Sequence, residues 1–146
     1  MLTPGAPAPD FTLTTDEETT ITLSDLRGQK VVLFFYPKAD TPGCTTQACG
    51  FRDHFPVIEA NGATVLGISP DAPAKLAKWR AKMGFPYNLL SDADHAVAEA
   101  YGVWGEKKMF GNTYIGIVRS HFVIDEDSRI ADTQFKISPQ KSVDTA

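Results

Sequence analysis

The sequence predicts an α/β sandwich in which helices flank a mixed β-sheet. Residues 31–36 and 63–69 are short, apolar and rich in β-branched or aromatic side chains, which is typical of strands buried on both faces. Each is followed by a segment of helical composition, and the chain closes with two strands joined by a turn. The 146 residues, 42% of them hydrophobic, suffice for such a core, so we expect one domain over residues 1–146.

The elements ahead of the central strand form an N-terminal extension. Residues 11–14 and 19–23 alternate apolar and polar side chains around an acidic turn, which predicts a β-hairpin. Residues 24–28 have the composition of one capped helical turn closed by Gly28. The central strand, residues 31–36, follows and ends at Pro37.

The second half of the chain predicts alternating helices and strands. Residues 44–60 have helical composition, in which Gly50 and Pro56 predict a kink or break. A second helix is expected to follow Asp71 and run through Met83, because Gly84 and Pro86 stop it. The remaining elements are expected to be a strand at residues 89–91, a helix at 94–101, and final strands at 114–124 and 129–135.

Charge and composition exclude several classes of protein. The net charge is −4 and no run of Lys and Arg stands out, so we expect no nucleic-acid partner. No apolar run could span a membrane, and residues 1–9 lack the basic and apolar regions of a secretory signal. A cytoplasmic protein is therefore expected. Its two cysteines are too few for a disulfide scaffold and draw attention for their reactivity instead.

Cys44 stands where a helix is expected to begin. The chain leaves the central strand through a loop rich in Pro and Gly and enters the helix at or near this residue. Unpaired backbone N–H groups and the positive end of the helix dipole lie at such a position. Both favour a thiolate, so the pKa of Cys44 is expected below the free value of about 8.5, and Cys44 is a candidate nucleophile.

Cys49 follows five residues later, and this spacing restricts how the two cysteines pair. In an intact helix their Cα atoms would be separated by roughly 8 to 9 Å. A disulfide requires Cα atoms within about 7 Å. Either the pair never bonds, or the helix unwinds to let it bond, which Gly50 makes less costly. The spacing suits oxidation of the first cysteine alone to a sulfenic acid that the second then attacks.

The segment from Pro37 to Cys49 reads Pro-x-x-x-Thr-Pro-Gly-Cys-Thr-x-Gln-x-Cys, which resembles the active-site motif of the peroxiredoxins. This form is similar to the bacterioferritin-comigratory subfamily, also called PrxQ. The resemblance covers roughly residues 5 to 135 and extends to residues 51–53, 89–92, 101–108 and 117–120. It implies a thioredoxin-like sandwich with an N-terminal extension, which agrees with the element order.

The resemblance also implies roles for individual residues. Cys44 matches the peroxidatic cysteine, and Cys49 matches the resolving cysteine of members that carry one in the same helix. Thr41 matches the hydroxyl that hydrogen-bonds the thiolate and the bound peroxide. Pro37 matches the proline that shields the pocket from water. Arg119, which interrupts an apolar strand, matches the arginine that stabilises the thiolate and polarises the peroxide.

The activity that follows is reduction of hydrogen peroxide and alkyl hydroperoxides, with thioredoxin as the external reductant. No metal or organic cofactor is required, and the subfamily suggests a monomer. Two alternatives stay open: a one-cysteine peroxidase resolved by an external thiol, and a non-catalytic thioredoxin-like binding or chaperone module. A zinc site at Cys44, Cys49 and His54 fits no common spacing and lacks a fourth ligand.

Two features of the sequence depart from the family pattern, one at His121 and one at the C-terminal end. His121 stands where the family often has Thr, and strand alternation would put it on the same face as Arg119. We expect it to add a group near the thiolate that titrates close to neutral pH; packing within the sheet is the alternative. The chain also ends at residues 138–146, where the family usually has a longer helix, which leaves the covering of the last layer open.

Overall fold

The computed structural model describes residues 4–37, 42–60, 62–109 and 112–134, and for residues 42–44, 106–109, 112–114 and 134 it describes the backbone alone. Seven strands of the described chain form one sheet in the order β2-β1-β5-β4-β3-β8-β9. The strands are β1 (Thr12–Thr15), β2 (Thr20–Thr22), β3 (Lys30–Phe35), β4 (Ala63–Ser69), β5 (Leu89–Ser91), β8 (Ser120–Ile124) and β9 (Ile130–Gln134).

The sheet is mixed, as predicted. β3, β4 and β5 are parallel to one another at its centre, whereas β8 and β9 on one side and β1 and β2 on the other pair antiparallel. The predicted N-terminal hairpin is confirmed as β1 and β2, and β1 attaches it to β5. The flanking helices are η1 (Leu23–Leu26), α1 (Pro42–Ala60), α2 (Pro73–Met83) and α3 (Ala96–Ala100).

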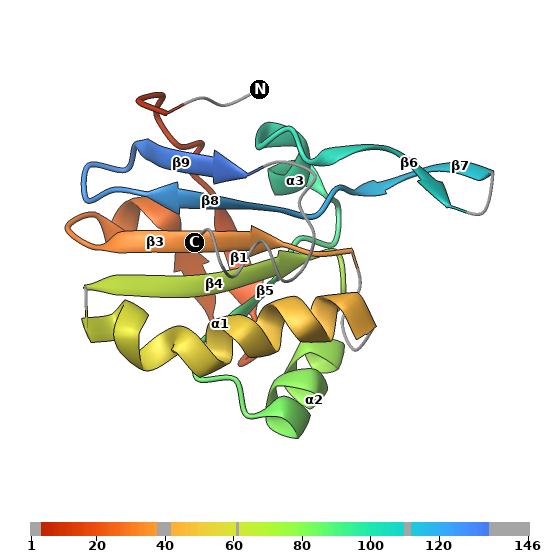
Figure 1. The fold of residues 1–146 in the computed structure, drawn as a ribbon, viewed down its shortest axis with the longest axis horizontal. Coiled ribbons are helices and arrows are strands. Elements are labelled where there is room, and N and C mark those ends of the chain that lie inside the picture. Colours follow the sequence, from red (N-terminus) through yellow and green to blue (C-terminus); the bar gives the residue numbers. More distant parts are fainter. Residues whose placement is uncertain (1–3, 38–41, 61, 110–111, 135–146) are drawn as a thin grey trace.

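Alternation along β3 separates two hydrophobic cores. Val32 and Phe34 belong to the core packed against α1 and α2, which also contains Phe51 and Trp79. Leu33 and Phe35 belong to the core on the opposite face, with side chains from η1 and α3. A strand buried on both faces is the pattern predicted for residues 31–36, and Figure 1 shows α1 and α2 together on one side of the sheet.

Of the kink or break predicted for the first long helix, the break is wrong. α1 runs without interruption from Pro42 to Ala60, with both Gly50 and Pro56 inside it. Proline removes one backbone donor from a helix, but burial of apolar side chains on the helix can outweigh that cost. Ala48 and Phe51 are fully buried, and Phe51 stacks on Phe34 with ring centroids 4.9 Å apart. This packing holds the helix together around Gly50, and partly buried Phe55 and Ile58 pack against the same core on either side of Pro56.

The single strand predicted at residues 114–124 is also wrong. It divides into β7 (Asn112–Ile117) and β8, with residues 118 and 119 outside both strands. β7 pairs antiparallel with β6 (Trp104–Met109), an element that the sequence did not predict, and Figure 1 shows this hairpin projecting from the body of the molecule. At this division the Val118 N–H donates to the carbonyl oxygen of Val103, and the Arg119 side chain hydrogen-bonds Gln47 of α1.

Candidate active site

The first turn of α1 holds the candidate nucleophile. β3 ends at Phe35, and the chain passes half-buried Pro37 before α1 begins at Pro42, at the right-hand end of the sheet in Figure 1. Cys44 is the third residue of this helix, so its backbone lies where sequence analysis expected it. The first N–H groups of a helix have no partners within the helix and favour negative charge nearby. Thr41 and the Cys44 side chain lie outside the described part.

Arg119 reaches this end of α1 from far along the chain. It lies between β7 and β8, and its Nη1 donates a hydrogen bond of 2.6 Å to Oε1 of Gln47. Gln47 is fully buried and lies three residues after Cys44, about one helical turn further on. The structure thus brings the predicted arginine to the helical turn that follows the predicted cysteine.

Sequence reasoning assigned Gln47 no role. The available signal was its place in the quoted motif, Thr-x-Gln-x-Cys. A buried amide needs hydrogen-bond partners, and a guanidinium offers donors in a fixed geometry. Gln47 therefore holds the Arg119 side chain in a defined position beside α1.

Cys49 is half-buried in the same unbroken helix and is a free thiol. Burial raises its pKa above the usual value, and the positive charge of Arg52 only partly opposes this effect. Regular helical geometry separates the Cα atoms of residues 44 and 49 by roughly 8 to 9 Å, beyond disulfide range. In this conformation Cys49 is both protonated and out of reach of Cys44.

His121 does not supply a group that titrates near neutral pH, contrary to expectation. It is fully buried, pairs with Phe34 in the sheet, and lies edge-to-face on Phe51 with centroids 6.4 Å apart. Burial lowers its pKa to about 4, although nearby Asp132 acts in the opposite direction. The alternation argument placed His121 from the sequence, but it could not reveal that α1 covers the imidazole.

The zinc arrangement of Cys44, Cys49 and His54 includes the Cys44 side chain, which lies outside the described part. His54 Nδ1 lies 2.9 Å from the carbonyl oxygen of Gly50, one turn back in its own helix. Over the described ranges, no group of three or more His, Cys, Asp or Glu side chains is placed to hold a metal ion. No helix in this part of the chain has the length and apolar character needed to cross a membrane.

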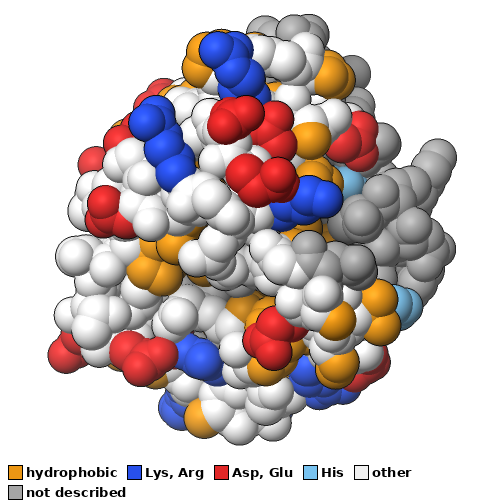
Figure 2. All heavy atoms as spheres, turned by 90° about the vertical axis from the view of Figure 1, so that its left-hand side faces the viewer, with side chains coloured by type: hydrophobic (Ala, Val, Ile, Leu, Met, Phe, Trp, Pro, Cys, Tyr) orange, Lys and Arg blue, Asp and Glu red, His pale blue; other side chains and the backbone are white. Residues whose placement is uncertain are grey.

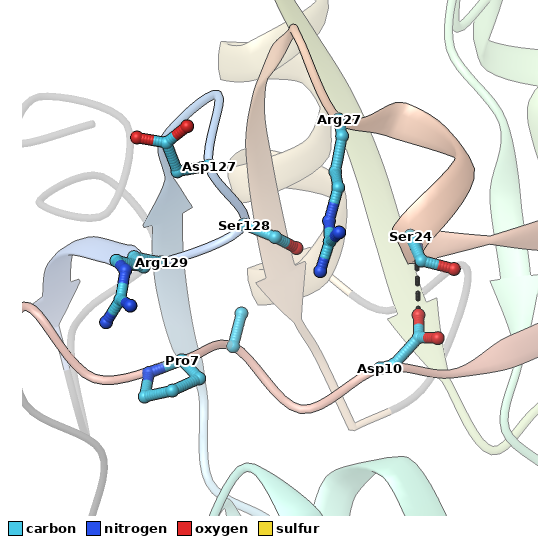
Figure 3. Close-up of a pocket in the computed structure, with 8 residues that line it drawn as sticks. Pro7, Asp10, Ser24, Arg27, Asp127, Ser128 and Arg129 are labelled. Carbon is cyan, nitrogen blue, oxygen red and sulfur yellow. Dashed lines mark hydrogen bonds between the residues drawn. The ribbon is translucent and has the colours of Figure 1, made fainter.

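A cavity of about 180 Å³ lies at the other end of the sheet (Figure 3). Its lining includes Arg27, just before β3, and Ser128 and Arg129, just before β9, with Asp10 hydrogen-bonded to the backbone of Ser24. Figure 2 looks at the molecule from this end and shows acidic and basic side chains intermixed. α1 begins beyond the opposite end of β3, so this cavity is separate from the candidate site.

Comparison with known proteins decides the family. A model described as the AhpC/TSA family matches residues 4–133. The chain belongs to this family. It is 54% identical over 138 residues to a putative peroxiredoxin bcp of Haemophilus influenzae, covering 93% of this chain and 89% of the relative. It is 49% identical over 126 residues to peroxiredoxin Bcp of Escherichia coli, covering 86% of this chain and 81% of the relative.

Solved peroxiredoxin structures confirm the predicted thioredoxin-like fold. A peroxiredoxin Q of Xanthomonas campestris matches with a TM-score of 0.90 at 33% identity, over 97% of this chain and 93% of that one. Peroxidoxin BcpB of Mycobacterium tuberculosis matches with a TM-score of 0.88 at 37% identity, over 99% of this chain and 94% of that one. The chain is thus similar throughout to peroxiredoxins of the BCP/PrxQ subfamily, and it is a peroxidase of the oxidoreductase class.

Proposed function

We propose that this peroxiredoxin reduces peroxides through a sulfenic acid on Cys44 that Cys49 converts into an intramolecular disulfide. The observation that carries the proposal is the bond from Arg119 to Gln47, because it brings a permanent positive charge to the turn of α1 that follows Cys44. Thiolate formation and peroxide cleavage both develop negative charge, which a fixed guanidinium stabilises.

In the first step the Cys44 thiolate attacks the terminal oxygen of the peroxide. An S–O bond forms and the O–O bond breaks, so the sulfur is oxidised to a sulfenic acid. The leaving hydroxide or alkoxide takes up a proton and departs as water or alcohol. Arg119 stabilises the charge that spreads over the breaking bond, Thr41 hydrogen-bonds the thiolate and peroxide, and Pro37 excludes water from the sulfur.

In the second step the sulfur of Cys49 attacks the sulfur of Cys44. The S–S bond forms, the S–O bond breaks, and the oxygen leaves as water. Because both residues lie in one helix, residues 44–50 of α1 must unwind before the sulfurs meet. A dithiol reductant of the thioredoxin kind then reduces the disulfide by two successive exchanges and restores both thiols.

Hydrogen peroxide and alkyl hydroperoxides are the proposed substrates. The Xanthomonas campestris bacterioferritin comigratory protein, described with alkyl peroxide reduction activity, is 32% identical over 98% of this chain. We further propose that residues 1–146 form one domain and that the protein is cytoplasmic. We also propose that it is a monomer, since a helix that must unwind during turnover is easier to open when no subunit covers it.

Turnover with thioredoxin tests this mechanism. Cys44→Ser is expected to abolish peroxide consumption, and Cys49→Ser is expected to abolish multiple turnovers while leaving one oxidation of Cys44 intact. Undiminished thioredoxin-driven turnover in Cys49→Ser would instead establish a one-cysteine peroxidase resolved by an external thiol.

A further inference from the structure

The hydroxyl of Tyr87 bonds the backbone of α1 directly beside Cys49. Tyr87, between α2 and β5, donates a hydrogen bond of 2.6 Å from its hydroxyl to the carbonyl oxygen of Ala48. The tyrosine is buried, and its ring stacks on Phe85 and lies edge-to-face on Phe34. The hydroxyl is therefore fixed in position, and its bond is made to the backbone of the segment that must unwind.

The next residues of α1 are held by contacts that do not involve the Tyr87 hydroxyl. Phe51 is fully buried and stacks on Phe34 with centroids 4.9 Å apart. Arg52 donates a 2.7 Å hydrogen bond from Nη1 to the carbonyl oxygen of Met83 at the end of α2. These contacts anchor α1 from residue 51 onward, so unwinding that frees Cys49 has a natural limit at Gly50. The Tyr87 bond lies on the unwinding side of that limit.

We propose that the Tyr87 hydroxyl is a latch that keeps the Cys49 segment of α1 folded and thereby sets the rate of disulfide formation. This inference rests on the proposed reaction of Cys49 with oxidised Cys44. While the latch is closed, the Cys44 sulfenic acid stays exposed to a second peroxide. That peroxide adds an oxygen to the sulfur, giving a sulfinic acid and one water or alcohol. The latch therefore determines how much peroxide the enzyme tolerates before it is inactivated.

Tyr87→Phe removes the hydroxyl and keeps the ring that packs on Phe34 and Phe85. The net contribution of one such hydrogen bond corresponds to about a twofold to tenfold change in the opening equilibrium. Disulfide formation after Cys44 oxidation is expected to accelerate by that factor. The peroxide concentration that inactivates half of the enzyme should rise by the same factor, while the rate of the first oxidation stays constant.

Tyr101→Phe is a matched control. Tyr101 is also buried and donates a 2.7 Å hydrogen bond from its hydroxyl to a backbone carbonyl, that of Pro9, but it belongs to the core on the opposite face of the sheet. The control should lower global stability without changing the rate of disulfide formation. Stopped-flow fluorescence measures the two oxidation steps, and mass spectrometry measures the sulfinic acid.

Hydrogen exchange in the reduced protein tests the latch separately from the chemistry. Amides of residues 45–50 should exchange about twofold to tenfold faster in Tyr87→Phe, and at the wild-type rate in Tyr101→Phe. Unchanged exchange, or acceleration equal to that in the control, would overturn the latch. If wild-type Cys44 and Cys49 form no disulfide, the proposed resolving step is wrong. The link from the latch to peroxide tolerance then fails as well, even if amide exchange is faster in Tyr87→Phe.

Discussion

Gln47 gives the sharpest prediction about the reaction itself. Its side-chain oxygen accepts a 2.6 Å hydrogen bond from Arg119, and Gln47→Ala removes that acceptor inside the protein. A hydrogen bond to a charged group contributes about 1.5–3 kcal/mol, and each 1.36 kcal/mol of barrier is tenfold in rate. If the bond serves to hold the guanidinium for catalysis, oxidation of Cys44 should slow by about 10- to 100-fold.

Single-turnover stopped-flow oxidation at varied peroxide concentration measures this rate. Gln29→Ala is a matched control, because Gln29 also accepts a side-chain hydrogen bond, 2.8 Å from Thr64, but lies exposed just before β3. That variant should oxidise at the wild-type rate. A Gln47→Ala enzyme that reacts within twofold of wild type would refute the positioning role.

Gln47→Glu separates positioning from simple packing. The carboxylate retains an acceptor for Arg119 and nearly the same volume, but adds a negative charge about one helical turn after Cys44. The pKa of the Cys44 thiol should then rise, so the pH profile of peroxide reduction should move to higher pH. A lower rate with an unshifted pH profile would indicate a purely structural effect.

Three further predictions concern stability. Because burial lowers the pKa of His121 to about 4, the unfolded chain binds the extra proton, and stability should fall by up to about 3 kcal/mol as pH drops from about 6.5 toward 4. Urea unfolding at several pH values should show this loss in wild type. An equal dependence of the free energy of unfolding on pH in His121→Phe would contradict it. In Gly67→Ala the new Cβ would lie 2.7 Å from the Phe34 ring, so we expect a loss of about 1–3 kcal/mol in the same assay, and wild-type stability would refute the packing. Arg80→Ala leaves buried Asp16 without its 3.0 Å ion pair and should cost about 1–3 kcal/mol; an unchanged urea midpoint would show that the pair contributes nothing.

The sequence pattern predicted those strands whose composition matches their burial in the structure. Residues 31–36 are a continuous apolar run and residues 63–69 are mainly apolar, and both form central strands of the sheet. The hairpin β6–β7 escaped prediction because its first strand, Trp104–Met109, contains Gly-Glu-Lys-Lys and lacks apolar alternation. The two strands form backbone hydrogen bonds with each other, in a register that pairs residues 104–109 with residues 112–117.

The sequence allowed candidate site residues to be proposed but not their arrangement, and Gln47 was not among them. The motif around Cys44 identified the helix start, which the structure confirms for the backbone. Contacts between distant segments were not predictable, since nothing local to Gln47, Tyr87 or His121 reveals its partner. The continuity of α1 through Pro56 likewise depends on packing across the core, which composition within the helix does not report.

The central claim is that Cys49 resolves oxidised Cys44 after α1 opens. Peroxide-driven oxidation of the wild-type protein, followed by mass mapping of its peptides, tests this claim most directly. The mechanism predicts one intramolecular disulfide between Cys44 and Cys49 after a single equivalent of peroxide. A sulfenic acid that persists on Cys44 beside an unmodified Cys49 thiol would contradict it.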